Sequence, residues 1–127
     1  MINLARSALV AQSTRLAAIA ANVANVGTTR TPEGGPYRRR EVILGASSGV
    51  APEVVVLGVR EDYLPPKLVY DPTHPDASPE GIVAYPNVDL PLEMVDLLSA
   101  MRAYEAGAML VEYARDASEA VLFLLRA

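Results

Sequence analysis

The sequence predicts an α+β fold in which two long terminal helices pair as a coiled coil. A small β-rich middle domain lies between them in the sequence. All ten prolines lie between Pro32 and Pro91. Both proline-free ends carry apolar residues at heptad spacing, whereas the middle alternates Val-, Ile- and Tyr-rich runs with turn-forming residues. We therefore expect a helical part over residues 1–31, a β-rich, Pro- and Gly-rich domain over 32–90 and a second helical part over 91–127.

The first helix is expected over residues 3–26, with Gly27 ending it in a left-handed conformation. Its apolar seam repeats every seven residues and is interrupted by one polar residue, Gln12. Asn22 and Asn25 share a face, where they either fix the register between copies or form a fraying polar helix end. The predicted assembly residues of this helix are Leu9, Gln12, Leu16, Ile19, Asn22, Val23 and Asn25.

The middle segment is expected to contain four strands. They are residues 41–44, 53–59, 67–70 and 81–85, each rich in Val, Ile or Tyr and bounded by Gly, Pro, Ser or Asp. Residues 45–52 are typical of a hairpin connection, and 62–66 of a proline-stiffened one. The longer link 71–80 carries three prolines, so we expect a partly rigid backbone without regular hydrogen bonding.

The second helix is expected over residues 92–125. Asp89 can cap it, Pro91 is tolerated in its first turn, and Glu93 complements the positive end of the helix dipole. Arg102 and Glu105 share a face, where they either orient neighbouring copies or form a local pair. The predicted assembly residues of this helix are Met94, Leu97, Met101, Arg102, Tyr104, Glu105, Val111, Val121 and Leu125.

The two expected helices differ in length, at about 36 Å and about 50 Å for a rise of 1.5 Å per residue. The longer helix would extend beyond the shorter one by several turns, with apolar side chains along the uncovered part. We expect copies of the chain, or partners, to cover them. The alternative is that each helix is an ordinary amphipathic helix on a globular core.

Composition and charge exclude several classes of site. The chain has no cysteine, which excludes disulfides, thiolate metal sites and cysteine nucleophiles. The net charge of −4 divides into +5 over residues 1–40 and −9 over the rest, and this asymmetry favours head-to-tail contact between copies. The uncharged run 16–29 is too short to span a membrane, and polar residues 12–15 interrupt any signal-peptide core. We expect neither membrane insertion nor a cleavable signal peptide.

Two clusters of polar residues are candidates for chemistry. Asp71, His74 and Asp76 could bind a metal, but the intervening prolines restrict their convergence and favour a structural turn. Arg38, Arg39 and Arg40 could hold nucleic acid, but in an acidic chain they better fit a salt-bridging contact between subunits. Neither a nucleophile elbow nor a phosphate-binding loop is present. We predict no enzyme, no cofactor and no nucleic-acid partner.

Three stretches together resemble the flagellar axial proteins, which are the rod and hook subunits. Residues 7–9 and 19–26 are similar to the N-terminal signature of that family. Residues 29–39, with the sequence TRTPEGGPYRR, and residues 68–77 and 81–88 narrow the resemblance to proximal rod subunits. Residues 93–95 and 102–106 of the second helix fit the same group. Gly107 departs from it, because members commonly carry Asn there; the glycine either allows close helix approach or weakens that turn.

The resemblance implies a structural subunit of the bacterial flagellar basal-body rod, with another axial rod or hook subunit as the alternative. Such subunits are exported through the flagellar type III apparatus, assemble in the periplasm and transmit torque to the hook. Their terminal helices form the inner coiled-coil layer of a tube, with the β-rich part outside. The implied partners are copies of the chain, other rod subunits, the proteins at the junction with the membrane ring, and the export apparatus.

Overall fold

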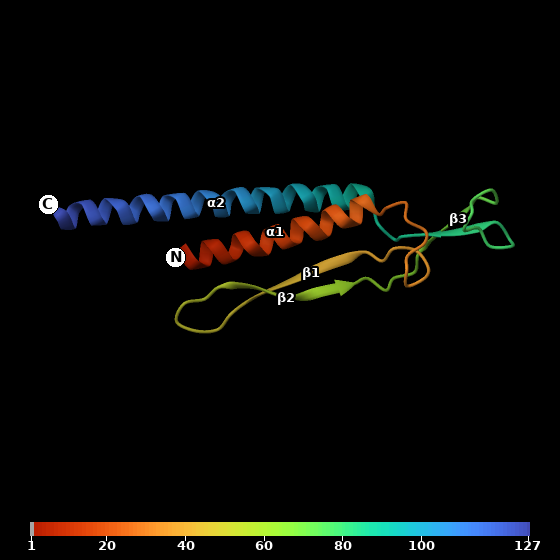
Figure 1. Cartoon of the computed structure of the whole chain (residues 1–127), viewed down its shortest axis with the longest axis horizontal. Helices are drawn as coiled ribbons and strands as arrows, with labels where there is room; N and C mark the ends of the chain where they lie inside the picture. The colour runs from red at the N-terminus through yellow and green to blue at the C-terminus, as the bar shows by residue number, and fades with distance from the viewer. Residues whose placement is uncertain (1) are drawn as a thin grey trace.

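Two antiparallel helices of unequal length run along most of the molecule (Figure 1). The computed structural model describes residues 2–127, so residue 1 of the expected N-terminal part lies outside it. Helix α1 spans Ile2–Ala24 and helix α2 spans Leu90–Arg126. A β-hairpin packs against α1 on the side away from α2, which makes α1 the middle of three layers.

This hairpin consists of β1 (Arg40–Ala46) and β2 (Val54–Glu61), paired antiparallel with an irregularity between Ile43 and Leu44. Alternate residues of β1 turn half-buried side chains towards α1, as expected for a sheet with one covered face. Near the start of α1 a hydrogen bond joins the two layers, since the backbone N–H of Val54 donates to the Ser7 hydroxyl over 2.9 Å.

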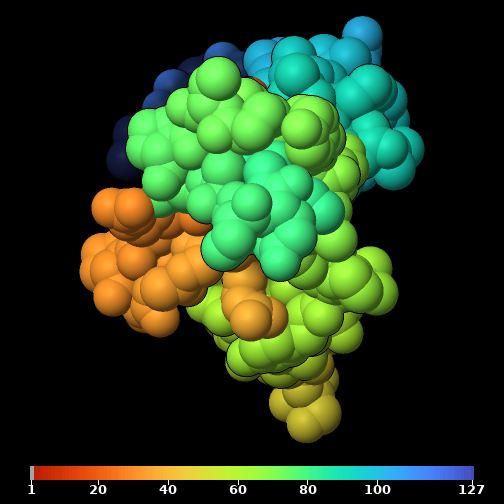
Figure 2. All heavy atoms as spheres, turned by 90° about the vertical axis from the view of Figure 1, so that its right-hand side faces the viewer, coloured from red at the N-terminus to blue at the C-terminus, as the bar shows by residue number. Residues whose placement is uncertain are grey.

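A second, separate antiparallel pair consists of β3 (Lys67–Tyr70) and β4 (Ile82–Tyr85). This β3–β4 arm, residues 67–85, lies beyond the helices at the end opposite the chain termini. Figure 2 looks onto that end, with the arm in green in front of the teal start of α2 and beside the orange loop that follows α1. Within residues 2–127, neither strand packs against a helix or against the first hairpin.

The expected elements are all confirmed, with shifted ends. The four strands occur where the sequence placed them, β1 and β2 being longer than expected, and Asp89 caps α2 by accepting a hydrogen bond from the Leu92 N–H. The prediction for Gly27 is wrong, because its φ is not positive. Helix α1 ends earlier, in tighter turns in which the Val26 N–H donates to the Val23 carbonyl and the Thr28 N–H to the Asn25 carbonyl. The Asn25 side-chain amide shares the Ala21 carbonyl with its own backbone N–H.

The face of α2 that packs against α1 is a stripe of residues spaced by seven. Its buried members are Glu93, Ala100, Gly107 and Ala114. A Cβ atom added at Gly107 would lie 3.1 Å from Leu9 Cδ2, so the two helices approach closely at this glycine. The expectation that Gly107 allows close helix approach is therefore confirmed.

Part of the predicted coiled-coil seam of α2, including the half-buried Leu97 and Val111, lies beside the buried stripe, and part of it lies further round the helix. Its residues Met94 and Met101 lie one position after the buried stripe and are exposed. Small side chains let the two backbones come close, whereas large ones at these positions would hold them apart. The helices pair within the chain, but pairing along the predicted seam is not confirmed.

The predicted mismatch of helix lengths is confirmed. With 23 residues in α1 and 37 in α2, the lengths are about 34 Å and about 55 Å. The segment of α2 after Ala114, residues 115–126, extends past the start of α1 (Figure 1), and we call it the C-terminal overhang. Its five consecutive apolar residues, 121–125, are 52–78% exposed.

We expect Gly107→Leu to lower the free energy of unfolding by about 2 kcal/mol, because the new side chain overpacks the contact with Leu9. The matched control is Ala108→Leu on the exposed neighbouring position, which should change it by less than about 0.5 kcal/mol. Urea unfolding followed by circular dichroism measures both. Equal effects of the two substitutions would contradict the close approach at Gly107.

Candidate functional site

The end of α1 meets the start of α2 at a buried polar cluster. Asn22 and Glu93 are 0% and 1% exposed. The Asn22 amide nitrogen donates to the Arg40 carbonyl over 2.8 Å and to Glu93 Oε2 over 3.3 Å. Its oxygen accepts from the Arg40 N–H and from the Tyr37 hydroxyl, each over 2.9 Å. One side chain thus joins α1, α2 and the strand β1. We call Asn22, Tyr37, Arg39 and Glu93 the buried junction.

An ion pair completes the buried junction. The Arg39 guanidinium donates from Nε to Glu93 Oε1, and its Nη2 lies 3.7 Å from Asp96 Oδ2 at the surface. Burial lowers the pKa of Arg39, but the hydrogen bond and charge of Glu93 outweigh it and raise the pKa above its ordinary value. In the described part of the chain, every buried side-chain nitrogen and oxygen has a hydrogen-bond partner.

Tyr37 contributes to the junction as a neutral donor. Burial raises the pKa of its hydroxyl, with the nearby Arg40 opposing and Glu93 adding to the shift. The phenol therefore keeps its proton, which it donates to Asn22. Sequence patterns missed this role because the tyrosine lies in an irregular loop.

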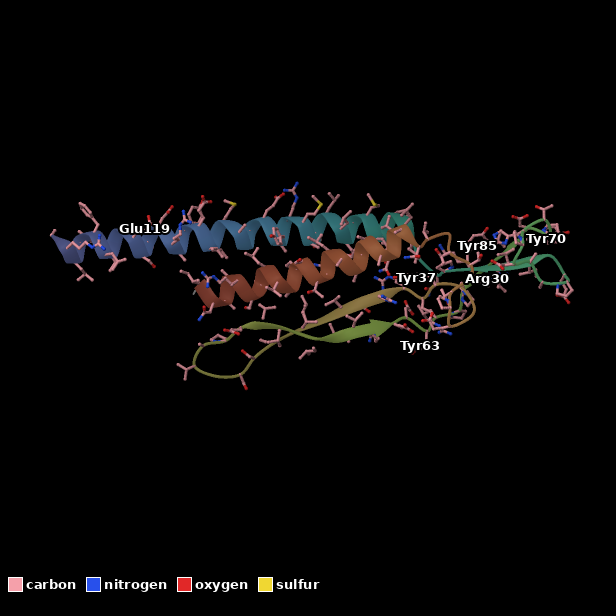
Figure 3. All side chains as sticks on the ribbon, viewed as in Figure 1. Arg30, Tyr37, Tyr63, Tyr70, Tyr85 and Glu119 are labelled. Atoms are coloured by element: carbon pink, nitrogen blue, oxygen red, sulfur yellow. The ribbon has the colours of Figure 1, made fainter. Side chains whose placement is uncertain are left out.

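The structure separates the three arginines that the sequence grouped. Arg38 lies over the ring of Tyr63 at 4.9 Å, and Arg40 lies over the ring of Tyr37 at 5.8 Å. Figure 3 shows both tyrosines near the end where α1 stops and α2 starts. Arg39 turns inward to Glu93. The arginines therefore make three different contacts within the chain rather than one continuous strip.

The predicted assembly residues are not all on the surface. Asn22 was expected at a contact between copies, but its amide is fully engaged inside the chain, where it sets the register of α1 against α2 and β1. Ile19 is also buried. Half-buried positions are Leu9, Gln12, Leu16, Val23, Asn25, Leu97 and Val111; exposed positions are Met94, Met101, Arg102, Tyr104, Glu105, Val121 and Leu125. No salt bridge between described residues joins Arg102 to Glu105.

The side chains of the proposed metal site make hydrogen bonds within the loop. Asp71 accepts from the Thr73 hydroxyl over 2.9 Å, and His74 Nδ1 accepts from the Asp76 N–H over 3.0 Å. Residues 2–127 contain no group of three or more His, Cys, Asp or Glu side chains arranged to hold a metal ion. These contacts give the loop between β3 and β4 a fixed shape.

The Asp76 carboxylate attaches this loop to the segment after α1. It accepts from the Thr29 hydroxyl over 2.7 Å and pairs with the Arg30 guanidinium. The Thr29 hydrogen bond lowers the pKa of Asp76 below its ordinary value of 3.8; burial opposes this, and Arg30 reinforces it. Figure 3 shows Arg30 at the base of the arm, with Tyr85 beside it.

Helix α2 exposes a large apolar surface on the sides that do not meet α1. Exposed members of this α2 outer surface include Leu92, Met94, Val95, Leu98, Met101, Met109, Leu110 and Tyr113. Large exposed apolar patches on proteins are often interaction sites. Among the described residues, neither helix has a stretch apolar enough to cross a lipid bilayer.

Comparison with known proteins assigns the family. Residues 2–30 match the family described as flagella basal body rod protein, and residues 80–122 match the C-terminal family of flagellar basal body rod FlgEFG proteins. The flagellar basal-body rod protein FlgC of Borreliella burgdorferi is 38% identical over 98% of this chain and 95% of its own length. The chain belongs to the FlgC family. FlgC of Escherichia coli is 44% identical over 84% of this chain and 81% of its own, and FlgC of Bacillus subtilis 41% over 83% of each.

The matched segments cover α1 and most of α2, and the second also contains β4, whereas Tyr37 and Arg39 of the buried junction lie between the two matches. The first match contains α1 together with Thr29 and Arg30, and the second contains Glu93 and α2 as far as Leu122. The resemblance to flagellar axial proteins is confirmed. In this FlgC relative, the helices are held together by the buried junction, which lies partly in each matched segment.

We expect Glu93→Ala to lower the free energy of unfolding by about 3 kcal/mol, because it leaves the partly buried charge of Arg39 without its main acceptor. The control Asp96→Ala removes only the exposed, 3.7 Å contact and should cost less than about 1 kcal/mol. Chemical unfolding measures both. Replacing the pair together, as Arg39→Met with Glu93→Leu, should recover most of the loss. An equal cost for the single and double changes would contradict this account.

The attachment of the β3–β4 arm through Asp76 should depend on pH. Since the pKa of Asp76 is lowered, the stability contributed by its carboxylate is fully present above the ordinary value of 3.8 and is lost as the pH falls through the lowered pKa. Amide chemical shifts of residues 71–81, followed by NMR down to about pH 2.5, should report this release. Asp76→Asn should remove the transition and loosen the loop at neutral pH, whereas Glu80→Gln should do neither. A transition that persists in Asp76→Asn would refute the assignment.

Proposed function

We propose that this chain is a structural subunit of the bacterial flagellar basal-body rod, assembling through α1 and α2 with copies of itself and with other rod subunits. The names of its relatives support the rod assignment, since each is a flagellar basal-body rod protein. The single observation that supports assembly through the helices is the α2 outer surface, which nothing else within residues 2–127 covers. We assign the chain no enzymatic role.

The energetics of this surface favour assembly. Burying one large aliphatic or aromatic side chain contributes about 1.5–3 kcal/mol. The overhang alone exposes five such residues in a row, Val121–Leu125, around the full circumference of the helix. A helical stretch that is apolar all round, as residues 121–125 are after the charged start of the overhang, is found in the interior of a structure, so neighbouring subunits are the natural cover.

The layered arrangement of the chain supports an inner position for its helices and an outer position for its β-rich part in the rod. We propose that residues 1–31 and 91–127 form the core layer of a tube and that residues 32–90 lie outside it. In keeping with this, the β1–β2 hairpin covers only the side of α1 away from α2, which leaves α2 free for neighbours (Figure 1). The buried junction makes the two helices a stiff pair, a property that transmission of torque to the hook requires.

The location follows from the same proposal. We propose that the chain leaves the cell through the flagellar type III apparatus, without a cleavable signal peptide, and assembles in the periplasm at the proximal rod. There it would meet the proteins at the membrane-ring junction as well as other rod subunits. The matches over both helices support export and assembly of the kind that axial proteins share.

We expect Leu98→Asp on the α2 outer surface to abolish swimming and rod assembly in a strain lacking the native subunit, because a charge would be buried between subunits. The isolated protein should unfold as the parent does, since Leu98 is exposed. Val50→Asp, at the exposed tip of the first hairpin, is the matched control and should leave swimming normal. Electron microscopy of purified basal bodies scores the rods. Intact rods with Leu98→Asp would argue against assembly through this surface.

A further inference from the structure

The methionines of helix α2 form a row of exposed sulfur atoms. Of the chain's methionines, those within residues 2–127 are Met94, Met101 and Met109, which are 45%, 43% and 51% exposed. At about 100° of rotation per residue, they lie within about 80° of one another around the helix axis. Figure 3 shows their sulfur atoms, in yellow, along the edge of α2 that faces away from α1. We call these three residues the methionine row.

The methionine row places readily oxidised sulfur on the α2 outer surface. The chain has no cysteine, whose thiolate would otherwise compete for an oxidant. The buried core of residues 2–127 contains no methionine, so none of the described thioethers is shielded by packing inside the chain. Oxidation of sulfur follows its exposure to solvent. The free subunit therefore offers the whole row to a dissolved oxidant.

We propose that the methionine row is an oxidation site, at which a peroxide converts the free subunit into a form that cannot join the rod. In this step the thioether sulfur attacks one oxygen of hydrogen peroxide, the O–O bond breaks and water leaves. Sulfur loses two electrons and becomes the sulfoxide, while the peroxide is reduced. The inference rests on the proposed function, since it states what modification of the α2 outer surface does to assembly.

The sulfoxide makes an apolar part of this surface polar. A thioether packs well in irregular apolar contacts, whereas the sulfoxide oxygen is a hydrogen-bond acceptor. The neighbours of Met94 three and four positions away include Leu90, Leu97 and Leu98, and none of these side chains has a donor. Burial of an unpaired acceptor between subunits costs free energy. Oxidation therefore weakens the contact between subunits and leaves the core of each subunit unchanged.

Peroxide treatment of the isolated subunit and of purified basal bodies tests the site, with peptide mass spectrometry to locate each added oxygen. We expect all three methionines of the isolated subunit to react at close to the rate of free methionine. In basal bodies they should react at least tenfold more slowly, because neighbouring subunits cover them. Unreactive methionines in the isolated subunit would overturn the proposal. Equal rates in the two samples would also overturn it, since the row would then lie outside the contacts.

Two triple variants separate polarity from shape. Met94→Leu, Met101→Leu and Met109→Leu together keep the row apolar without sulfur, whereas Met94→Gln, Met101→Gln and Met109→Gln together imitate the polarity of the sulfoxide. Both isolated proteins should unfold as the parent does, because the three positions are exposed. In a strain lacking the native subunit, we expect normal rods and swimming from the leucine variant. The glutamine variant should give at least tenfold fewer rods by electron microscopy.

Each other outcome of this comparison is decisive. Normal rods from the glutamine variant would overturn the proposal and leave the proposed function intact. Loss of rods in both variants would overturn it by showing that side-chain shape decides the contact. A glutamine variant that unfolds in isolation would overturn it as well, because the damage would lie within the subunit. Absence of the native subunit from purified rods would overturn the proposed function itself.

Discussion

Three parts of the chain that are far apart in sequence meet at the side chains of Asn22 and Glu93. Asn22 comes from the end of α1, Glu93 from the first turn of α2, and the backbone of Arg40 from the start of β1. A buried amide and carboxylate are costly unless every polar atom is paired, and here all of them are. Sliding either helix by one residue would break several of these bonds together. The junction therefore fixes one arrangement of layers among those that an apolar contact alone would permit.

Much of the fold follows from local patterns in the sequence. Proline positions and Val-rich runs identified both helices and all four strands, because helix and strand periods and turn residues act over a few positions. The cap at Asp89 and the overhang of α2 were predictable for the same reason. The end of α1 was not, since the chain leaves the helix through tight turns over residues 23–28 and not through a left-handed glycine at Gly27.

The contacting face of α2 could not be predicted from its large apolar residues. These lie on nearly every side of the helix, so a heptad of Met94 and Met101 fits the pattern as well as one of Ala100 and Gly107. The second is the one that meets α1, because only small side chains permit the close approach. The Arg39–Glu93 pair joins positions separated by 54 residues, and no local pattern reports such a contact. The exposed methionines and leucines remain available for the assembly that the sequence suggested.

The β3–β4 arm differs in kind from the rest of the molecule. It packs against neither helix among the described residues, and the side chain of Asp76 ties its loop to Thr29 and Arg30. Apart from the buried Val83 and the half-buried Tyr85, the large apolar side chains of its strands are exposed. Regions with few apolar contacts open locally at a lower free energy than the whole protein. The arm can therefore lose its order, or swing about its base, while the paired helices keep theirs. In a tube whose wall must stay rigid, such an appendage can adjust to unlike surroundings without transmitting strain to the wall.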